Sequence, residues 1–339
     1  MKDLLVRTMF AGVLSVVSMI STVSAAVEAQ GTAWVNIHGY EGCVKLFNDT
    51  VNVVLEPNCG GRVLVYALNG RNVLFVDPAQ DGWIYTPGGK RIGPCAGRFD
   101  IGPEKMGPPR ENLWIGKWKA EITGPRSARM TSVDDPSSGV RLVRDFRLDR
   151  TTSRLDCTQT ILNISGETKR YFHWSRTFAE GGGICVVPIS PGSRFPEGYL
   201  FYEPKSSPRY MNFQPETNES TTVRDDCLVI SSTPPFPKFG LDSAAGWLAY
   251  LTKNDQLFVK TFPVYPERVY GEMAGLTVSI WYVDDRCELE PIGPREVLEP
   301  GESASFTETW WLLPYEHPGG EELDIDTLKK FVGLNTEQN

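Results

Sequence analysis

The chain is interrupted at short intervals by residues that end regular structure, and this feature most restricts its fold. Its 339 residues include 32 glycines and 25 prolines, which leave little room for long helices. Between them lie short runs rich in valine, leucine, isoleucine and aromatic residues. These runs are predicted strands: 51–55, 62–68, 73–76, 140–148, 154–164, 247–251 and 257–262. Many short strands with turn residues between them predict an all-β sandwich or barrel.

The connections between the runs favour one large antiparallel domain. Asn69-Gly70 separates two runs and predicts a tight hairpin. Only residues 323–334 carry apolar side chains at helical spacing, so helices are expected to be few and short. No linker or change in composition divides the chain after its N-terminal segment. Residues 27–339 are therefore expected to form a single domain.

The N-terminal segment has the pattern of a secretory signal peptide. Lys2 and Arg7 precede or flank an apolar stretch, residues 9–20, and small residues follow at 23–25. The apolar stretch is too short for a confident membrane span. We expect residues 1–26 to be removed on export. The mature protein is then secreted or periplasmic and is not inserted in a membrane.

Charge and cysteine usage restrict the partners. The formal net charge is −8 and no basic cluster occurs, so nucleic acid is an unfavourable partner. An uncharged or weakly basic solute fits better, unless a local arginine pocket overrides the average. No CxxC or CxxH pair occurs, so a metal site is not expected. We also expect no cofactor and a monomeric protein. The seven cysteines are predicted to be buried thiols, with room for one or two disulfides: Cys43, Cys59, Cys95, Cys157, Cys185, Cys227 and Cys287.

The segment 276–314 is the strongest candidate for a functional surface. Three alternating runs are separated by Asp-Asp and by Pro/Gly turns, which predicts sequential antiparallel strands. In the middle run Arg286, Glu288 and Glu290 alternate with apolar residues. Because side chains of a strand point to alternate faces, these three share one face. An acidic face of this kind predicts a wet surface or cleft.

Three passages of the chain resemble one known superfamily. They are VNVVLEPNCGGRV at 51–63, QTILNISGETKRYFH at 159–173, and ELEPIGP at 288–294 followed by LEPGES at 298–303. They are similar to the opening strand and turn, the central strand pair and the closing glutamate-bearing strand of the galactose mutarotase-like proteins. The resemblance is greatest to a secreted bacterial branch rather than to true mutarotases. It implies a large antiparallel β-supersandwich with a carbohydrate-binding cleft on the concave face of one sheet.

The resemblance also implies catalytic residues. In aldose epimerases a glutamate accepts the proton of the anomeric hydroxyl and a histidine protonates the ring oxygen. Glu290 matches the base, with Glu288 as the substitute, and His173 matches the acid. The second histidine and the Asn-His motif of those enzymes have no clear equivalent here.

A purely structural role is open for each of these residues. Both glutamates could be solvated strand residues, or could pair with Arg286 and Arg295. A histidine among aromatic residues is often a packed, hydrogen-bonded core residue, and His173 lies in such a stretch. The two interpretations of His173 are evenly matched.

Further residues are candidates for substrate binding. A Gly/Pro-rich loop offers charged side chains on a stiff scaffold, aromatic residues could stack on sugar rings, and two lysines lie among apolar residues. Each also has a structural interpretation, as an ion pair, a core residue or a lysine that reaches solvent. The candidate binding residues are Arg98, Asp100, Glu104, Arg176, Trp174, Trp114, Lys238 and Lys260, and Trp83 and Trp118 are further candidates for stacking on a sugar ring.

Three functions are consistent with these residues. The first is a secreted carbohydrate-active enzyme, epimerase-like, that acts on a mono-, oligo- or polysaccharide. The second is a polysaccharide lyase, in which Arg98 or Arg176 neutralises a uronate and His173 or Tyr171 abstracts the proton. The third is a glycan-binding accessory domain without catalytic activity.

Overall fold

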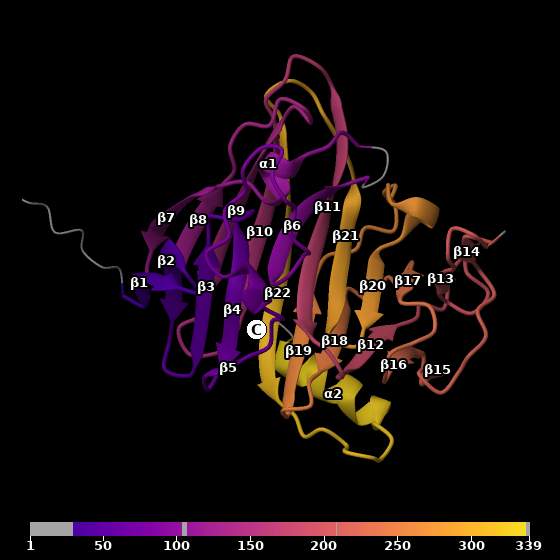
Figure 1. Ribbon diagram of the computed structural model, residues 1–339. Coiled ribbons are helices and arrows are strands. Elements are labelled where there is room, and N and C mark those ends of the chain that lie inside the picture. The colour runs from indigo at the N-terminus through magenta and orange to yellow at the C-terminus, as the bar shows by residue number, and fades with distance from the viewer. Residues whose placement is uncertain (1–29, 104–106, 208, 337–339) are drawn as a thin grey trace, which may run out of the picture.

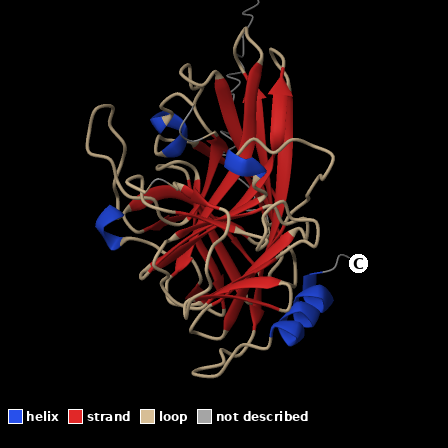
Figure 2. Ribbon diagram, turned by 90° about the vertical axis from the view of Figure 1, so that its right-hand side faces the viewer, coloured by secondary structure: helices blue, strands red, loops and turns tan. Residues whose placement is uncertain are grey.

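The computed structural model describes residues 30–103, 107–207 and 209–336. The predicted signal peptide, residues 1–26, and the candidate Glu104 lie outside this part of the chain. The described residues form two large antiparallel sheets that pack face to face (Figure 1 and Figure 2). The predicted all-β sandwich is confirmed, whereas the single-domain organisation stays a prediction.

The larger sheet has twelve strands and crosses Figure 1 from β1 to β14. Each neighbouring pair is antiparallel. In spatial order its strands are β1 (Thr32–Ile37), β2 (Tyr40–Phe47), β3 (Val51–Glu56), β4 (Arg62–Leu68), β6 (Gly97–Gly102), β11 (Lys169–Glu180), β21 (Arg286–Leu298), β20 (Val278–Val283), β17 (Lys238–Leu241), β13 (Leu200–Tyr202) and β14 (Met211–Asn212), with β5 (Arg71–Asn72) beside β4.

The smaller sheet has ten strands and lies behind the larger one in Figure 1. In spatial order they are β15 (Thr221–Arg224), β16 (Cys227–Ile230), β12 (Ile184–Pro188), β18 (Trp247–Leu251), β19 (Gln256–Thr261), β22 (Ser303–Pro314), β10 (Leu155–Asn163), β9 (Val140–Leu148), β8 (Ser127–Thr131) and β7 (Lys119–Gly124). We call the face of each sheet that contacts the other sheet its inner face, and the opposite face its outer face.

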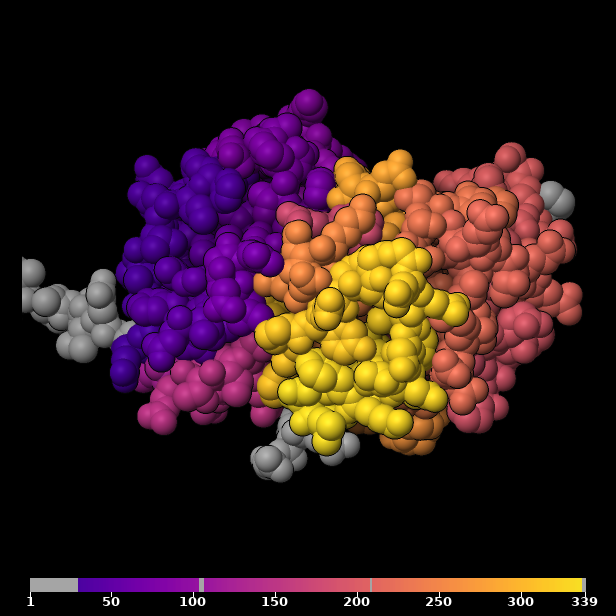
Figure 3. All heavy atoms as spheres, turned by 90° about the horizontal axis from the view of Figure 1, so that it is seen from below, coloured from indigo at the N-terminus to yellow at the C-terminus, as the bar shows by residue number. Residues whose placement is uncertain are grey.

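Helices are few, as expected. The described helices are α1 (Glu111–Trp114), α2 (Ile325–Thr336) and the 3₁₀ turns η1 (Pro78–Gln80) and η2 (Met273–Gly275). The apolar side of α2 packs on the outer face of the smaller sheet, and the C-terminal segment occupies the middle of the lower surface in Figure 3. Among the described residues, no helix is long and apolar enough to cross a bilayer.

Two sequence-based predictions, a strand at 73–76 and the pairing of the last strands, differ from the structure. Residues 73–76 are not a regular strand, because the Asn72 side chain takes over ladder hydrogen bonds: its Oδ1 accepts from the amides of Tyr66 and Leu74 at 2.9 and 3.2 Å. In addition, β22 does not pair with β21. The Asn163 side-chain amide donates to the Leu298 carbonyl at 2.9 Å. The Asn163 backbone amide donates to the Glu302 carbonyl, also at 2.9 Å. The turn after β21 is thereby fixed to the end of β10, and β22 enters the smaller sheet.

A buried ion pair lies between the sheets, in an interior that is mostly apolar. Lys260 Nζ of β19 lies 2.9 Å from Glu308 Oε2 of β22, and neither side chain is exposed. The same ammonium donates to the hydroxyls of Ser175 and Thr177 on β11 at 2.8 and 3.1 Å. It also donates to the Leu289 carbonyl of β21 at 3.2 Å. Lys260 therefore bonds to both sheets, and its predicted role in substrate binding is wrong.

Lys260→Met is expected to destabilise the protein strongly. It leaves the Glu308 carboxylate buried without its cation, and loss of one partner of a buried pair costs about 3–5 kcal/mol. Lys119→Met is the matched control, because the Lys119–Glu121 pair is solvent-exposed and such pairs contribute at most about 1 kcal/mol. The free energy of unfolding in urea measures both. Equal losses in the two variants would contradict the role given to Lys260.

Candidate functional site

Most of the candidate site residues lie together on the outer face of the larger sheet. Arg98 and Asp100 on β6 stand opposite Arg176 and Trp174 on β11 in the strand register. On the other side of β11, Thr177 pairs with Leu289, which places Arg176 beside the glutamates on either side of Leu289. The group also contains Glu288 and Glu290 of β21 and Lys238 of β17. Trp114 of α1 contacts Arg176 from outside the sheet.

Arg176 is the centre of this group. Its Nε donates to Glu288 Oε1 at 2.7 Å and lies 3.6 Å from Glu290 Oε1. Its Nη1 is 3.9 Å from Asp100 Oδ2. The guanidinium also lies over the indole rings of Trp114 and Trp174, at 4.9 and 5.3 Å from their centres. One arginine thus contacts three carboxylates and two aromatic rings. The predicted pairing of the glutamates with Arg286 or Arg295 is replaced by a pairing with Arg176.

Asp100 is held by Arg110, a residue that the sequence did not single out. The guanidinium forms a two-pronged pair with the carboxylate, at 2.7 Å from Nε to Oδ1 and 3.0 Å from Nη2 to Oδ2. Arg110 immediately precedes α1. The pair therefore ties the start of α1 to the sheet. No sequence pattern marks this residue, because the contact spans a loop whose path the sequence does not specify.

The acidic face is buried rather than wet. Glu288 is 2 % exposed and Glu290 is fully buried, because apolar residues and loops cover the outer face beside them. Burial, together with the nearby charge of Glu290, raises the pKa of Glu288 to about 8. Burial also acts on Glu290, but the charges of Lys238 and Arg176 outweigh it and lower the pKa of this carboxyl. At neutral pH the two groups therefore hold one proton between them.

Glu290 has unused hydrogen-bonding capacity. Both of its carboxyl oxygens are buried, with Arg176 Nε 3.6 Å from Oε1 and the side chains of Ser279 and Glu288 as neighbouring hydrogen-bond donors. An ionised carboxylate has about four acceptor positions, so Glu290 keeps capacity to accept a hydrogen bond from a ligand hydroxyl. Lys238 lies beside it, with its ammonium 5.2 Å from the Trp174 ring centre and 5.7 Å from that of Tyr202.

A hollow of about 480 Å³ opens next to the cluster. Asp100 and Arg176 line it from the sheet, and Arg110, Glu111 and Trp114 line it from the start of α1. The two glutamates are not part of its wall, although Glu288 contacts Arg176 directly. Arg176 therefore connects the hollow to the buried carboxyl groups.

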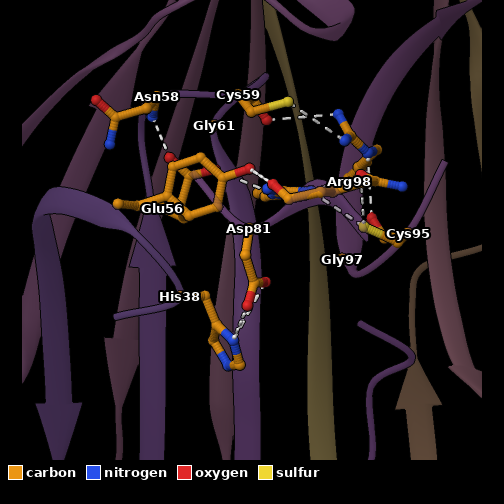
Figure 4. A network of polar contacts seen from close by, with 12 residues as sticks. His38, Glu56, Asn58, Cys59, Gly61, Asp81, Cys95, Gly97 and Arg98 are labelled. Atoms are coloured by element: carbon orange, nitrogen blue, oxygen red, sulfur yellow. Dashed lines mark hydrogen bonds and ion pairs between the residues drawn. The ribbon is translucent and has the colours of Figure 1, made fainter. Parts of the chain in front are cut away.

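Arg98 supports the site and does not project into it. Its Nη1 donates to the Trp114 carbonyl at 2.6 Å and its Nε to the Cys95 carbonyl at 3.1 Å, and Figure 4 shows the side chain between Cys59 and Cys95. The guanidinium lies 4.9 Å from the centre of the Trp114 ring. Arg98 is fully buried and bonds mainly to backbone. These bonds hold α1 in place, so a structural role fits it better than direct contact with a ligand.

Next to Arg98, a second buried network holds the loops over β3 and β4. Arg62 Nε pairs with Glu56 Oε2 at 2.9 Å, and Arg62 Nη1 donates to Cys95 Sγ at 3.0 Å. All seven cysteines are free and buried, so the predicted buried thiols are observed without the disulfides that were left open. Among the described residues, no group of three histidine, cysteine or acidic side chains is placed to hold a metal ion.

His173 does not face Glu290. It is fully buried on the inner face, stacked between Phe99 and Phe306, and its Nε2 lies 3.1 Å from the Ala304 carbonyl oxygen. Alternation along β11 explains this, because Trp174 and Arg176 point outward and His173 must then point inward. Burial lowers the pKa of His173 to about 4. The predicted acid–base pair of Glu290 and His173 is therefore not formed, and the core interpretation of His173 is correct.

The other residues considered for the site lie elsewhere. Tyr171 is buried in the interior, where its hydroxyl donates to the Ser138 carbonyl at 2.9 Å. Trp118 is buried and donates from Nε1 to the Leu113 carbonyl at 3.0 Å, so it is a core residue. Trp83 is half-buried beside Tyr85, in the loop before β6. The structure thus removes both of the proton-abstracting residues that the lyase hypothesis proposed.

Comparison with solved structures identifies the fold of the chain. A candidate aldose 1-epimerase from Escherichia coli K12 superposes with a TM-score of 0.57 at 11 % identity, over 80 % of this chain and 99 % of that one. The chain has the galactose mutarotase-like fold. A galactose mutarotase-like protein from Lactobacillus casei gives 0.56 at 8 % identity, over 80 % and 100 % of the two chains. One from Clostridium acetobutylicum gives 0.51 at 12 % identity, over 84 % and 99 %.

Beyond the three motif passages, the similarity to this fold is structural. No protein-family model matches the chain, and no curated protein sequence matches it. The two sheets nevertheless form the β-supersandwich expected from the three motif passages. At identities of 8–12 % the galactose mutarotase-like neighbours establish the fold, and the activity has to be argued from the site.

The pH dependence of stability tests the placement of His173. Its pKa is about 4 in the folded state and about 6.5 when unfolded, so the unfolded chain binds the proton more tightly between these values. Stability should therefore fall as pH drops from 6.5 to 4, by up to about 1.4 kcal/mol per pH unit from this group. His173→Phe removes the titration and should show a shallower slope in urea unfolding from pH 7 to 4. Equal slopes would indicate a normally titrating, accessible His173.

Proposed function

We propose that the protein is a carbohydrate-active enzyme that interconverts sugar anomers, with Glu290 as the general base. The observation that carries this proposal is the buried Glu290 carboxylate, which lies beside the cations Arg176 and Lys238 and a second carboxyl, Glu288. Its pKa is lowered, so it is ionised at neutral pH and able to accept a hydroxyl proton. The fold is the one found in the candidate aldose 1-epimerase of Escherichia coli.

The residues around Glu290 suit a sugar. Trp174 offers an apolar ring, and Arg176 and Lys238 offer hydrogen-bond donors next to it. Sugar recognition combines such rings with a few placed polar groups. Arg176 lies over both glutamates, so a sugar that reaches Glu290 from the hollow exchanges hydrogen bonds with this guanidinium. In the proposed mechanism Arg176 moves aside or donates to a ring hydroxyl.

The proposed substrate is a monosaccharide or the end of a longer glycan. The hollow of about 480 Å³ is within the range of small-molecule sites. We also propose that the protein acts outside the cytoplasm, because its first 26 residues have the pattern of an export signal. A polysaccharide lyase is less well supported, since His173 and Tyr171 face the interior.

Polarimetry tests the proposal. Freshly dissolved α-aldoses should equilibrate faster with the protein than without it. Glu290→Gln should reduce this acceleration by about 10²–10⁴-fold, because the amide cannot accept the hydroxyl proton. Glu219→Gln, at an exposed site, is the control for the same chemical change and should leave the rate unaltered.

Other outcomes would favour the rival functions. New absorbance from unsaturated uronate ends during incubation with uronate-containing polysaccharides would indicate a lyase. Binding to a glycan array without turnover in either assay would indicate an accessory domain. Acceleration that persists unchanged in Glu290→Gln would contradict the assignment of the base.

A further inference from the structure

The proposed reaction needs a proton donor for the ring oxygen, and no histidine is placed to supply it. All three histidines of the chain lie in the described part. His173 is on the inner face, His38 contacts Asp81 in the loop before β6, and His317 bonds through its amide to Asp255. A different group on the outer face must therefore take this role if Glu290 is the base.

We propose that Glu288 is the catalytic acid, so that two glutamates of one strand form the acid–base pair. This inference rests on the proposed anomer interconversion. Glu288 and Glu290 are two residues apart on β21, so both side chains leave the sheet on its outer face. Both are buried, and Arg176 contacts both, at 2.7 Å and 3.6 Å. The remaining carboxylate of the cluster, Asp100, is engaged by Arg110.

The charges around the pair allow only one of the two carboxyls to ionise easily. Lys238 from β17 and Arg176 from β11 favour the charged form of Glu290. Burial and the charge of Glu290 act against ionisation of Glu288, although Arg176 partly offsets them, and its pKa is raised to about 8. Within the described residues, Asp100 of β6 also lies near the pair through Arg176, and Arg110 from the loop before α1 neutralises it. Two neighbouring carboxyls with separated pKa values are a common source of an acid and a base in one site.

The proton transfers balance. Glu290 takes the proton of the anomeric hydroxyl, and the electron pair of that O–H bond forms the carbonyl of the open-chain aldose. The bond between C1 and the ring oxygen breaks, and the ring oxygen takes the proton of Glu288. Rotation about the C1–C2 bond and attack of the hydroxyl on the other face of the carbonyl reverse both transfers. The enzyme ends with Glu288 protonated and Glu290 ionised, as it began.

The test compares Glu288→Gln with wild type and with the control Glu219→Gln, using polarimetry from pH 5 to 10. Wild-type kcat/KM should fall above about pH 8 as Glu288 loses its proton. Glu288→Gln should lower kcat/KM by about 10²–10⁴-fold, because the amide cannot donate this proton to the ring oxygen. Glu219→Gln should keep both the rate and the decline at high pH. Circular dichroism establishes that each variant is folded.

Infrared difference spectroscopy gives a readout that does not depend on turnover. The wild-type spectrum minus that of Glu288→Gln at pH 7 should contain the band of a protonated carboxyl, and the band should disappear above about pH 8. If Glu288→Gln fails to fold, the wild-type spectrum at pH 7 minus that at pH 10 supplies the band, and the rate measurement uses Glu288→Asp. It should lower the rate by moving the acid away from the ring oxygen, and keep the decline at high pH.

The outcomes separate this inference from the proposed function. If Glu290→Gln is inactive but Glu288→Gln retains the wild-type rate, the inference fails and the proposed function stands. If the wild type has no protonated-carboxyl band at pH 7, Glu288 is not the acid, whatever the activity. If the wild type accelerates no aldose, the proposed function fails and the catalytic role of Glu288 with it.

Discussion

The structure depends on a buried charge that must be satisfied between its two sheets. The ammonium of Lys260 lies in an interior from which water is excluded, where an unpaired charge would be very costly. Glu308 supplies the counter-charge from the same sheet, and hydroxyls of Ser175 and Thr177 supply acceptors from the opposite one. These bonds hold β11 at a definite position over β19 and β22. Apolar packing alone is less directional and would allow small shifts between the sheets.

The same strands carry the candidate site on their other face. Ser175 and Thr177 point inward to Lys260, and Arg176 between them points outward to Glu288 and Glu290. The position of the outward arginine is therefore determined in part by the inward hydroxyls. A site built on regular strands, with its supporting contacts on the opposite face, is held more precisely than a site built on loops. Arg110 and Arg98 hold α1 against the sheet, through bonds to Asp100 and to the Trp114 carbonyl.

Charge compensation also explains why the site is closed in this structure. Arg176 lies over two indole rings and contacts three carboxylates, so its charge is compensated within the described residues. A sugar that displaces it has to provide comparable hydrogen bonds. Such exchange favours ligands with several hydroxyls over apolar ones. The galactose mutarotase-like fold sets the position of this face, whereas the chemistry resides in the particular side chains on it.

The sequence determined the local order, and only the tertiary structure decided which faces meet. Residue alternation was sufficient to place Glu288 and Glu290 on one face, because a strand's period of two is a local property. Short apolar runs between turn residues located strands such as β4 and β9. Alternation could not relate the face of His173 to that of Glu290. The two residues lie on different strands, and their relative orientation depends on the pairing between β11 and β21. The interior position of Lys260 was equally hidden, because burial depends on what packs against a strand from distant parts of the chain.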